Sequence, residues 1–173
     1  MGPARLAGVK ATARAIALVL AAVLLTGCAS WWAKPVEQRT THGPTARQFW
    51  LLRQYMANNR EPKQDERRMW EDDLELQIQR YLMKNPEAAS SLQVSTFKFH
   101  KQVVTGMTKE QVLILLGPPD VVTDDQTQME KLARRYWPQL QGNVTEAWVY
   151  PLGWNMYFAG QKLVDITQYL EKD

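Results

Sequence analysis

The sequence predicts an α+β protein, in which an N-terminal helical hairpin precedes short helices and a three-stranded antiparallel sheet. Apolar residues recur every three or four positions between residues 45 and 84, which indicates the two helices of the hairpin. A capped apolar segment at 108–116 indicates a short helix that ends before a Gly-Pro-Pro sequence. Segments rich in aromatic and β-branched residues within 146–166 are separated by turns and indicate antiparallel strands.

The first 27 residues have the parts of a signal peptide. Basic residues come first, and an uncharged apolar run of 11 residues follows at 15–25. A helix of that length is too short to cross a hydrocarbon core of ~30 Å. The run ends in Leu25-Thr26-Gly27-Cys28, which resembles the lipobox of bacterial lipoproteins. This resemblance implies that residues 1–27 are removed and that the Cys28 thiol receives a diacylglycerol.

Removal of residues 1–27 changes the charge of the chain. The whole sequence has 21 Lys and Arg against 18 Asp and Glu. Residues 1–27 contain three basic residues and no acidic residue, so cleavage removes three positive charges. The processed chain is therefore neutral, and its composition gives no argument for nucleic acid binding. Cys28 is the only cysteine, so no disulfide within the chain is expected. Ala29 stands where an aspartate would favour inner-membrane retention, which predicts sorting to the outer membrane.

The chain is predicted to consist of four parts. Pro35, Gly43 and Pro44 interrupt a segment without periodicity, so we expect a tether that could extend by about 50 Å between the lipid and the fold. The predicted parts are a signal peptide at 1–27, a lipidated tether at 28–44, a helical hairpin at 45–85, and an α+β domain at 86–173 with a helical insert near 125–138.

Two helices are expected in the hairpin. Thr45 can cap the first, which should run to about residue 59 with Phe49, Leu52 and Met56 on one face. The second should run from Pro62 to about residue 84. The connection between them is short, which predicts an antiparallel pair.

The most specific motif of the folded part extends from Gly106 to Asp120. Thr108 can cap a helix, and Gln111 completes a capping box. Gly117 can end the helix with a positive φ, and the prolines after it prevent its continuation. An extended segment should follow at 120–123.

This motif resembles the BamE (SmpA/OmlA) family of small outer-membrane lipoproteins. The matching positions are Gly106, Met107, Thr108, Val112, Leu116, Gly117 and Pro119. The resemblance covers roughly residues 95–170 and implies two short helices packed on a three-stranded antiparallel sheet. It also implies a helix just before Gly106, although the alternation at 95–104 would suit a strand. The hairpin and the insert are not part of the family core.

The strands predicted at 146–150, 154–158 and 162–166 are rich in aromatic residues. Alternation places Trp148 and Tyr150 on one face of the sheet and Ala147 on the other. Helices that cover only one face would leave Trp148 and Tyr150, with Trp154 or Tyr157, as an exposed contact surface. The alternative is that these aromatic side chains pack beneath the hairpin as core.

Little in the sequence indicates catalysis, and no metal or cofactor site is expected. His42 and His100 have no nearby nucleophile or acid at a recognisable spacing. We therefore expect a non-enzymatic interaction lipoprotein on the periplasmic face of the outer membrane, anchored through Cys28. Its expected partners are outer-membrane β-barrels or other envelope proteins, in barrel assembly or envelope integrity. The alternative is a binding module for lipid headgroups, peptidoglycan or peptides.

Overall fold

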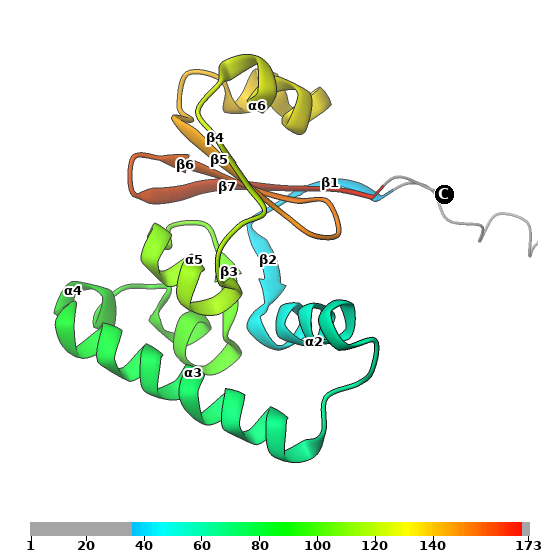
Figure 1. Cartoon of the computed structure of the whole chain (residues 1–173). Coiled ribbons are helices and arrows are strands. Elements are labelled where there is room, and N and C mark those ends of the chain that lie inside the picture. The colour runs from blue at the N-terminus through cyan, green and yellow to red at the C-terminus, as the bar shows by residue number, and fades with distance from the viewer. Residues whose placement is uncertain (1–35, 171–173) are drawn as a thin grey trace, which may run out of the picture. The chain divides into compact units, whose positions relative to one another are not determined.

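The computed structural model describes residues 36–170, and every element named below lies within this range. Figure 1 shows three layers, in which a five-stranded sheet lies between two groups of helices. None of the described helices combines the length and the apolar character needed to cross a membrane. In chain order the elements are β1 (Val36–Thr40), β2 (His42–Thr45), α2 (Ala46–Asn58), α3 (Gln64–Lys84), α4 (Pro86–Ala89), the π-helical turn η2 (Thr96–His100), β3 (Gln102–Val104), α5 (Lys109–Leu116), β4 (Val121–Thr123), α6 (Gln126–Ala133), the 3-10 turn η3 (Arg134–Tyr136), α7 (Trp137–Leu140), β5 (Glu146–Tyr150), β6 (Trp154–Ala159) and β7 (Lys162–Leu170).

The central sheet confirms the predicted α+β class but has more strands than expected. Its order is β1-β7-β6-β5-β4, and the β4–β5, β5–β6 and β6–β7 pairs are antiparallel. The three predicted strands are the inner three, β5, β6 and β7. The prediction of a three-stranded sheet is wrong because β1 and β4 each add an edge strand. β4 comes from the segment that was predicted to be extended after the motif helix.

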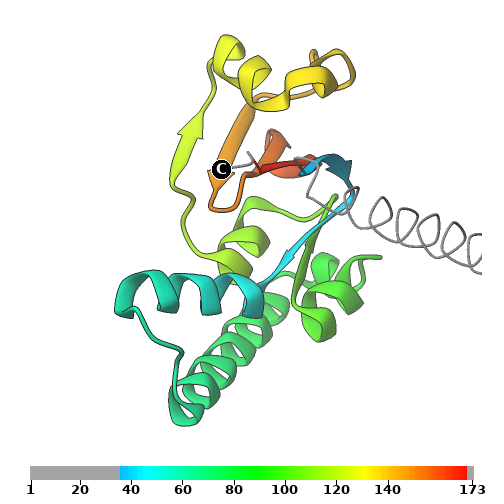
Figure 2. The ribbon, with the colours of Figure 1, turned by 90° about the vertical axis from the view of Figure 1, so that its right-hand side faces the viewer.

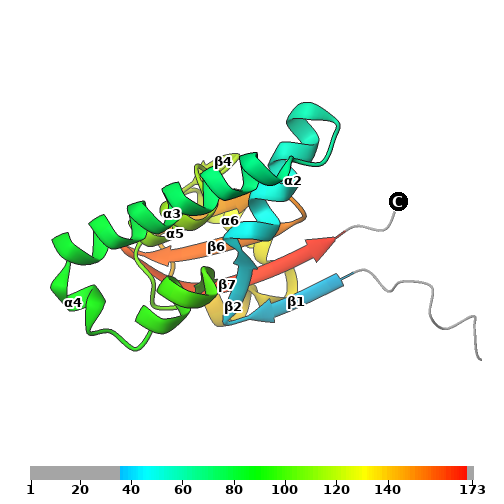
Figure 3. The same cartoon turned by 90° about the horizontal axis from the view of Figure 1, so that it is seen from below.

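The predicted tether is shorter than its sequence indicated. Residues 28–35 lie outside the described range, but β1 and β2 occupy most of residues 36–45, so the expectation of an irregular tether to residue 44 is wrong. Figure 3 shows β1 beside β7, and Gln38 Nε2 donates to Gln168 Oε1 across this pair at 2.9 Å. Eight residue steps separate Cys28 from Val36. Such a connection spans at most about 26 Å, about half of the reach expected earlier.

The two long helices form where the sequence predicts them, but the antiparallel hairpin is not confirmed. Thr45 caps α2 through a capping box with Gln48, as the sequence indicates. Trp50 of α2 stacks on Trp70 of α3 with ring centroids 4.7 Å apart. Beyond this contact the helices diverge (Figure 2), and each packs separately against α5. Of the residues predicted on one face of this helix, Phe49 is buried, whereas Met56 near the end of α2 is 68% exposed.

The segment at 95–104 contains both of the structures considered for it. Its first half forms the helical turn η2, and its second half forms β3, which pairs with β2 in a small antiparallel sheet. Phe97 of η2 is fully buried and contacts Tyr81 of α3 edge to face, with centroids 5.5 Å apart. A helix alone would be an incomplete description of this segment.

Each face of the central sheet has its own apolar core. On one face α2, α3, α5 and η2 cover Trp148, Tyr150, Met156 and Phe158. On the other face α6 and α7 of the insert cover a second cluster, which includes Tyr157. The insert therefore closes the sheet face that the sequence interpretation had left open.

Candidate functional site

The residues of the motif at 106–119 have structural roles in and around α5. Thr108 Oγ1 accepts from the Gln111 N–H at 3.2 Å, and Gln111 Oε1 accepts from the Thr108 N–H at 2.8 Å. This is the predicted capping box. Met107, Val112 and Leu116 are all at most 4% exposed. These side chains are occupied within the fold, so they offer no surface to a ligand.

The glycines of the motif have backbone conformations that favour glycine. Gly106 has φ +92°, and Gly117 has φ +73° with ψ −168°. The positive φ predicted for Gly117 is confirmed, and its ψ places it in a region that is almost exclusive to glycine. The Gly117 carbonyl also accepts from the Tyr150 hydroxyl at 3.0 Å. Pro119, the last motif residue, follows in the turn toward β4.

The predicted aromatic contact surface is wrong. Tyr157, Tyr150 and Trp148 are 0%, 1% and 6% exposed, and Trp154 is partly buried against the main core. The alternation itself is confirmed, since Trp148 and Tyr150 face one core and Tyr157 faces the other. The surface is absent because helices cover both faces: α2, α3 and α5 cover Trp148 and Tyr150, as in the alternative of a core, and α6 and α7 cover Tyr157. Burial raises the pKa of the Tyr150 and Tyr157 hydroxyls above the usual range, which keeps both hydroxyls protonated.

One ion pair links α5 to the sheet at a partly buried position. Lys109 Nζ lies 2.5 Å from Glu146 Oε2, and the Trp148 indole N–H donates to the other carboxylate oxygen. Burial acts to raise the pKa of Glu146, but the hydrogen bonds from Lys109 and Trp148 outweigh it, and the net pKa is lowered. The carboxylate is fully paired, so its role is to hold α5 on the sheet.

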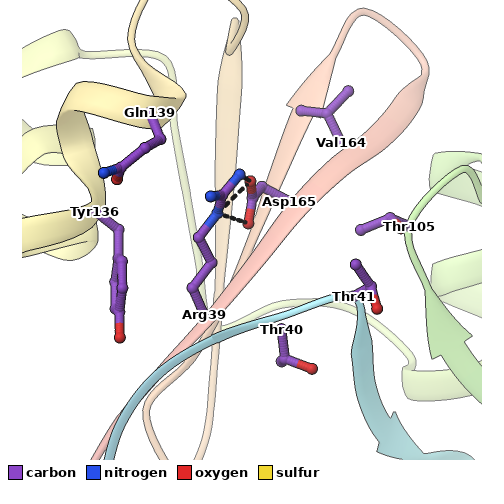
Figure 4. A pocket seen from close by; sticks show the side chains of 8 residues that line it. All are labelled: Arg39, Thr40, Thr41, Thr105, Tyr136, Gln139, Val164 and Asp165. Carbon is purple, nitrogen blue, oxygen red and sulfur yellow. Dashed lines mark hydrogen bonds and ion pairs between the residues drawn. The ribbon is translucent and has the colours of Figure 1, made fainter.

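One concave surface of the described chain is a polar groove of about 740 Å³, which we call the β7 groove. Figure 4 shows its walls, with insert residues on one side and the β2–β3 region on the other. A smaller cavity of about 150 Å³ continues it along α7 toward Asn143 and Val144. The β7 groove is lined by Arg39, Thr40, Thr41, Thr105, Tyr136, Gln139, Val164 and Asp165.

An ion pair between the exposed Arg39 and the buried Asp165 lies at the base of the β7 groove. Arg39 Nε is 3.1 and 2.9 Å from the two Asp165 oxygens, and Arg39 Nη2 is 2.6 Å from Oδ2. Asp165 is only 8% exposed and also accepts from the Ile166 N–H at 2.9 Å. The hydrogen bond to Asp165 raises the pKa of the Arg39 guanidinium. The two opposite charges compensate each other, so the pair contributes little net charge to the groove.

The insert wall of the β7 groove is fixed to β1. The Arg135 guanidinium and the Tyr136 hydroxyl both donate to the Glu37 carbonyl, at 2.8 and 3.1 Å. These bonds also cover an outward carbonyl of an edge strand, where a free carbonyl would invite pairing with other chains. Because the wall is fixed, the Tyr136 ring and the Gln139 amide keep their places on one side of the groove.

The groups that line the β7 groove are mainly polar. They are hydroxyls, an amide, an aromatic ring, a valine side chain and an ion-paired guanidinium and carboxylate. Over residues 36–170, no group of three or more His, Cys, Asp or Glu side chains could hold a metal ion. Hydroxyl and amide groups beside a compensated ion pair fit a polar ligand with little net charge.

Sequence reasoning missed this groove because its walls come from segments distant in the chain. Arg39 belonged to the supposed tether, and Gln139 lies at the end of the insert. One usable signal was Asp165, a carboxylate within an otherwise apolar predicted strand, since a buried acid requires a partner. The lipidation residue Cys28 lies outside the described residues.

Comparison of the chain with family models, with curated proteins and with solved structures finds no match. The resemblance of residues 106–119 to the BamE family therefore stays a prediction.

Proposed function

We propose that this chain is a lipoprotein anchored through Cys28 to the periplasmic face of the outer membrane, where its folded unit acts as a non-enzymatic interaction module. The observation that carries the proposal is the sequence Leu25-Thr26-Gly27-Cys28 at the end of a short apolar run after a basic start. The BamE-like motif at 106–119 supports it independently. Two or more acyl chains on one cysteine would make the attachment stable.

The short connection to β1 favours action close to the membrane. With at most about 26 Å of chain between Cys28 and Val36, β1 cannot move far from the anchor. Arg39, which is part of the β7 groove, is three residues further on. A partner held in this groove would therefore stay near the bilayer, as expected for a protein that handles membrane-inserted or membrane-bound partners.

The β7 groove is the binding site that we propose for the partner. Its neutral ion pair and hydroxyl groups suit a polypeptide segment, whose backbone amides are polar but uncharged. Candidate partners are outer-membrane β-barrel proteins and other envelope proteins, in barrel assembly or envelope integrity. The structural helices of the BamE-like motif would then position the groove without contacting the partner.

A second candidate is peptidoglycan, and one observation favours it. The Tyr136 ring, the Gln139 amide and the Arg39–Asp165 pair stand together in an open groove. Aromatic rings combined with amide and charged hydrogen-bonding groups also suit the apolar faces and hydroxyls of sugars. Retention of the protein on isolated peptidoglycan, lost when the groove is filled, would support this alternative.

The test is a mild-detergent pull-down of the membrane-bound protein, with co-purifying proteins identified by mass spectrometry. Gln139→Trp fills the groove, and Gln141→Trp adds the same bulk at an exposed position outside it. We expect the parent and Gln141→Trp to retain the same envelope partner and Gln139→Trp to lose it. Equal recovery with Gln139→Trp would exclude the groove as the site. Absence of any envelope partner from the parent would contradict the interaction module.

A further inference from the structure

Helix α3 has an apolar stripe on the side opposite its buried face. The stripe consists of Met69, Leu76 and Met83, which are 72%, 42% and 75% exposed. They are seven residues apart, so they lie on nearly the same side of the helix. The buried residues Leu74 and Ile78 point the other way. We call these three residues the α3 stripe.

The fold itself gives the α3 stripe no role. α3 is the outermost helix of its layer (Figures 1 and 3), and its packing depends on the opposite face. Single exposed apolar side chains are common on protein surfaces. Three at a seven-residue spacing along about 21 Å of one helix follow the repeat by which two helices pack side by side.

The charges beside the α3 stripe distinguish between the ways in which two copies could pair. Asp73 and Arg80 lie on one flank, three residues before and four residues after Leu76. In a parallel pair in register, the two-fold axis runs along the helices and each Asp73 would lie beside the partner's Asp72, which is repulsive. In an antiparallel pair centred on Leu76, Asp73 lies beside the partner's Arg80 with an axial offset of about 1.5 Å.

We propose that the α3 stripe pairs with the same stripe of a second copy, in an antiparallel arrangement with its two-fold axis at Leu76. Such a contact is self-complementary, as a two-fold dimer requires. Leu76 meets its own counterpart, and Met69 meets the partner's Met83. Two ion pairs between Asp73 and Arg80 flank this contact. On the other flank, Asp72 comes beside the partner's Gln79, which can donate to it.

Pairing through this surface is weak. Three apolar side chains per copy bury much less than the ~800 Å² per partner that is typical of stable complexes. The dimer therefore depends on local concentration, and a covalent trap detects it better than a measurement on dilute protein. The inference depends on neither the β7 groove nor the lipid anchor.

The test is disulfide formation between single cysteines introduced into the full chain, in isolated membranes treated with a mild oxidant. Leu76→Cys should give a disulfide-linked dimer, because the two positions face each other across the axis. Met83→Cys alone should give little, since the two copies of residue 83 lie about 21 Å apart in the antiparallel pair. Disulfides require Cα atoms less than about 7 Å apart. The parent, which has only Cys28, measures any dimer formed through that residue.

Two further cross-linking experiments test the antiparallel orientation of the pair and the ion pairs that flank it. Differently tagged copies carrying Met69→Cys and Met83→Cys should link to each other. In the Leu76→Cys background, Asp73→Arg or Arg80→Asp should lower the linked fraction about fivefold, and the two together should restore it. These positions are all exposed, and a thermal melt confirms that each variant is folded. The proposal is overturned if Leu76→Cys does not exceed the parent, if Met83→Cys links to itself equally well, or if the charge exchange fails to restore linking.

Discussion

Adding one methyl group at Gly153 should disrupt the end of the sheet. A Cβ at this position would lie 1.6 Å from the Tyr169 carbonyl oxygen and 2.5 Å from its carbonyl carbon. Both are backbone atoms of β7, so no side-chain rotation relieves the contact. The Tyr169 N–H also donates to the Gly153 carbonyl at 3.0 Å. This hydrogen bond breaks if the added methyl group pushes Gly153 away from β7. The turn between β5 and β6 therefore depends on the absence of a side chain.

The expected cost of Gly153→Ala follows from these contacts. Overpacking costs about 1–3 kcal/mol, a lost hydrogen bond about 1 kcal/mol, and an alanine at φ +70° roughly 1–2 kcal/mol. The total is about 3–6 kcal/mol, which corresponds to a fall in Tm of about 10–20 °C for a unit of this size.

Gly117→Ala is the matched control, because a Cβ there meets no atom within 4 Å. Backbone strain alone should cost about 1–3 kcal/mol, partly offset by about 0.4–1 kcal/mol from a less flexible unfolded chain. Urea unfolding followed by tryptophan fluorescence measures both variants. A loss for Gly153→Ala no greater than that for Gly117→Ala would refute the close backbone approach.

Three other substitutions test the packing and the ion pairs. Leu116→Ala should destabilise the fold by ~2–5 kcal/mol in urea titration, because Leu116 is 4% exposed in the main core; a loss below 1 kcal/mol would contradict that burial. Arg39→Ala leaves the Asp165 carboxylate buried without its partner and should lower the free energy of unfolding by ~1.5–3 kcal/mol. Arg39→Lys should recover part of this stability. Equal stability of Arg39→Ala and the parent would argue against the pair. Glu146 has a lowered pKa in the folded state, so its stabilisation is present above its ordinary pKa of 4.5 and is lost as the pH falls through the lowered value. The difference in Tm between the parent and Glu146→Gln should therefore be largest near neutral pH and shrink below about pH 4.5, and a constant difference would contradict the assigned pKa direction.

Local structure was predictable wherever neighbouring residues determine it. Thr45 and Thr108 cap helices through glutamines three residues later, and Asp125 caps α6, as the sequence indicates. The alternation that places Trp148 and Tyr150 on one face of the sheet and Ala147 on the other is also confirmed, although the expectation that the first face is exposed is wrong. Capping boxes and strand alternation depend only on residues close in the sequence, which explains these results.

Contacts between distant segments could not be predicted in the same way. β1 has no periodicity of its own and becomes a strand by pairing with β7, more than 120 residues later in the chain. The burial of Tyr157 depends on where the insert packs, and no local pattern specifies that position. The β7 groove requires both arrangements at once, because Arg39 comes from β1 and Gln139 from the insert.

Intact-mass and peptide mass spectrometry of the protein purified from membranes tests the central claim most directly. Lipoprotein processing predicts a mature chain that begins at Cys28 and carries a thioether-linked diacylglycerol with an additional amide-linked acyl chain. It also predicts that Cys28→Ala stays uncleaved at this site and takes up no lipid label. A mature chain that still contains residues 1–27, or one whose Cys28 carries no lipid, would contradict the account.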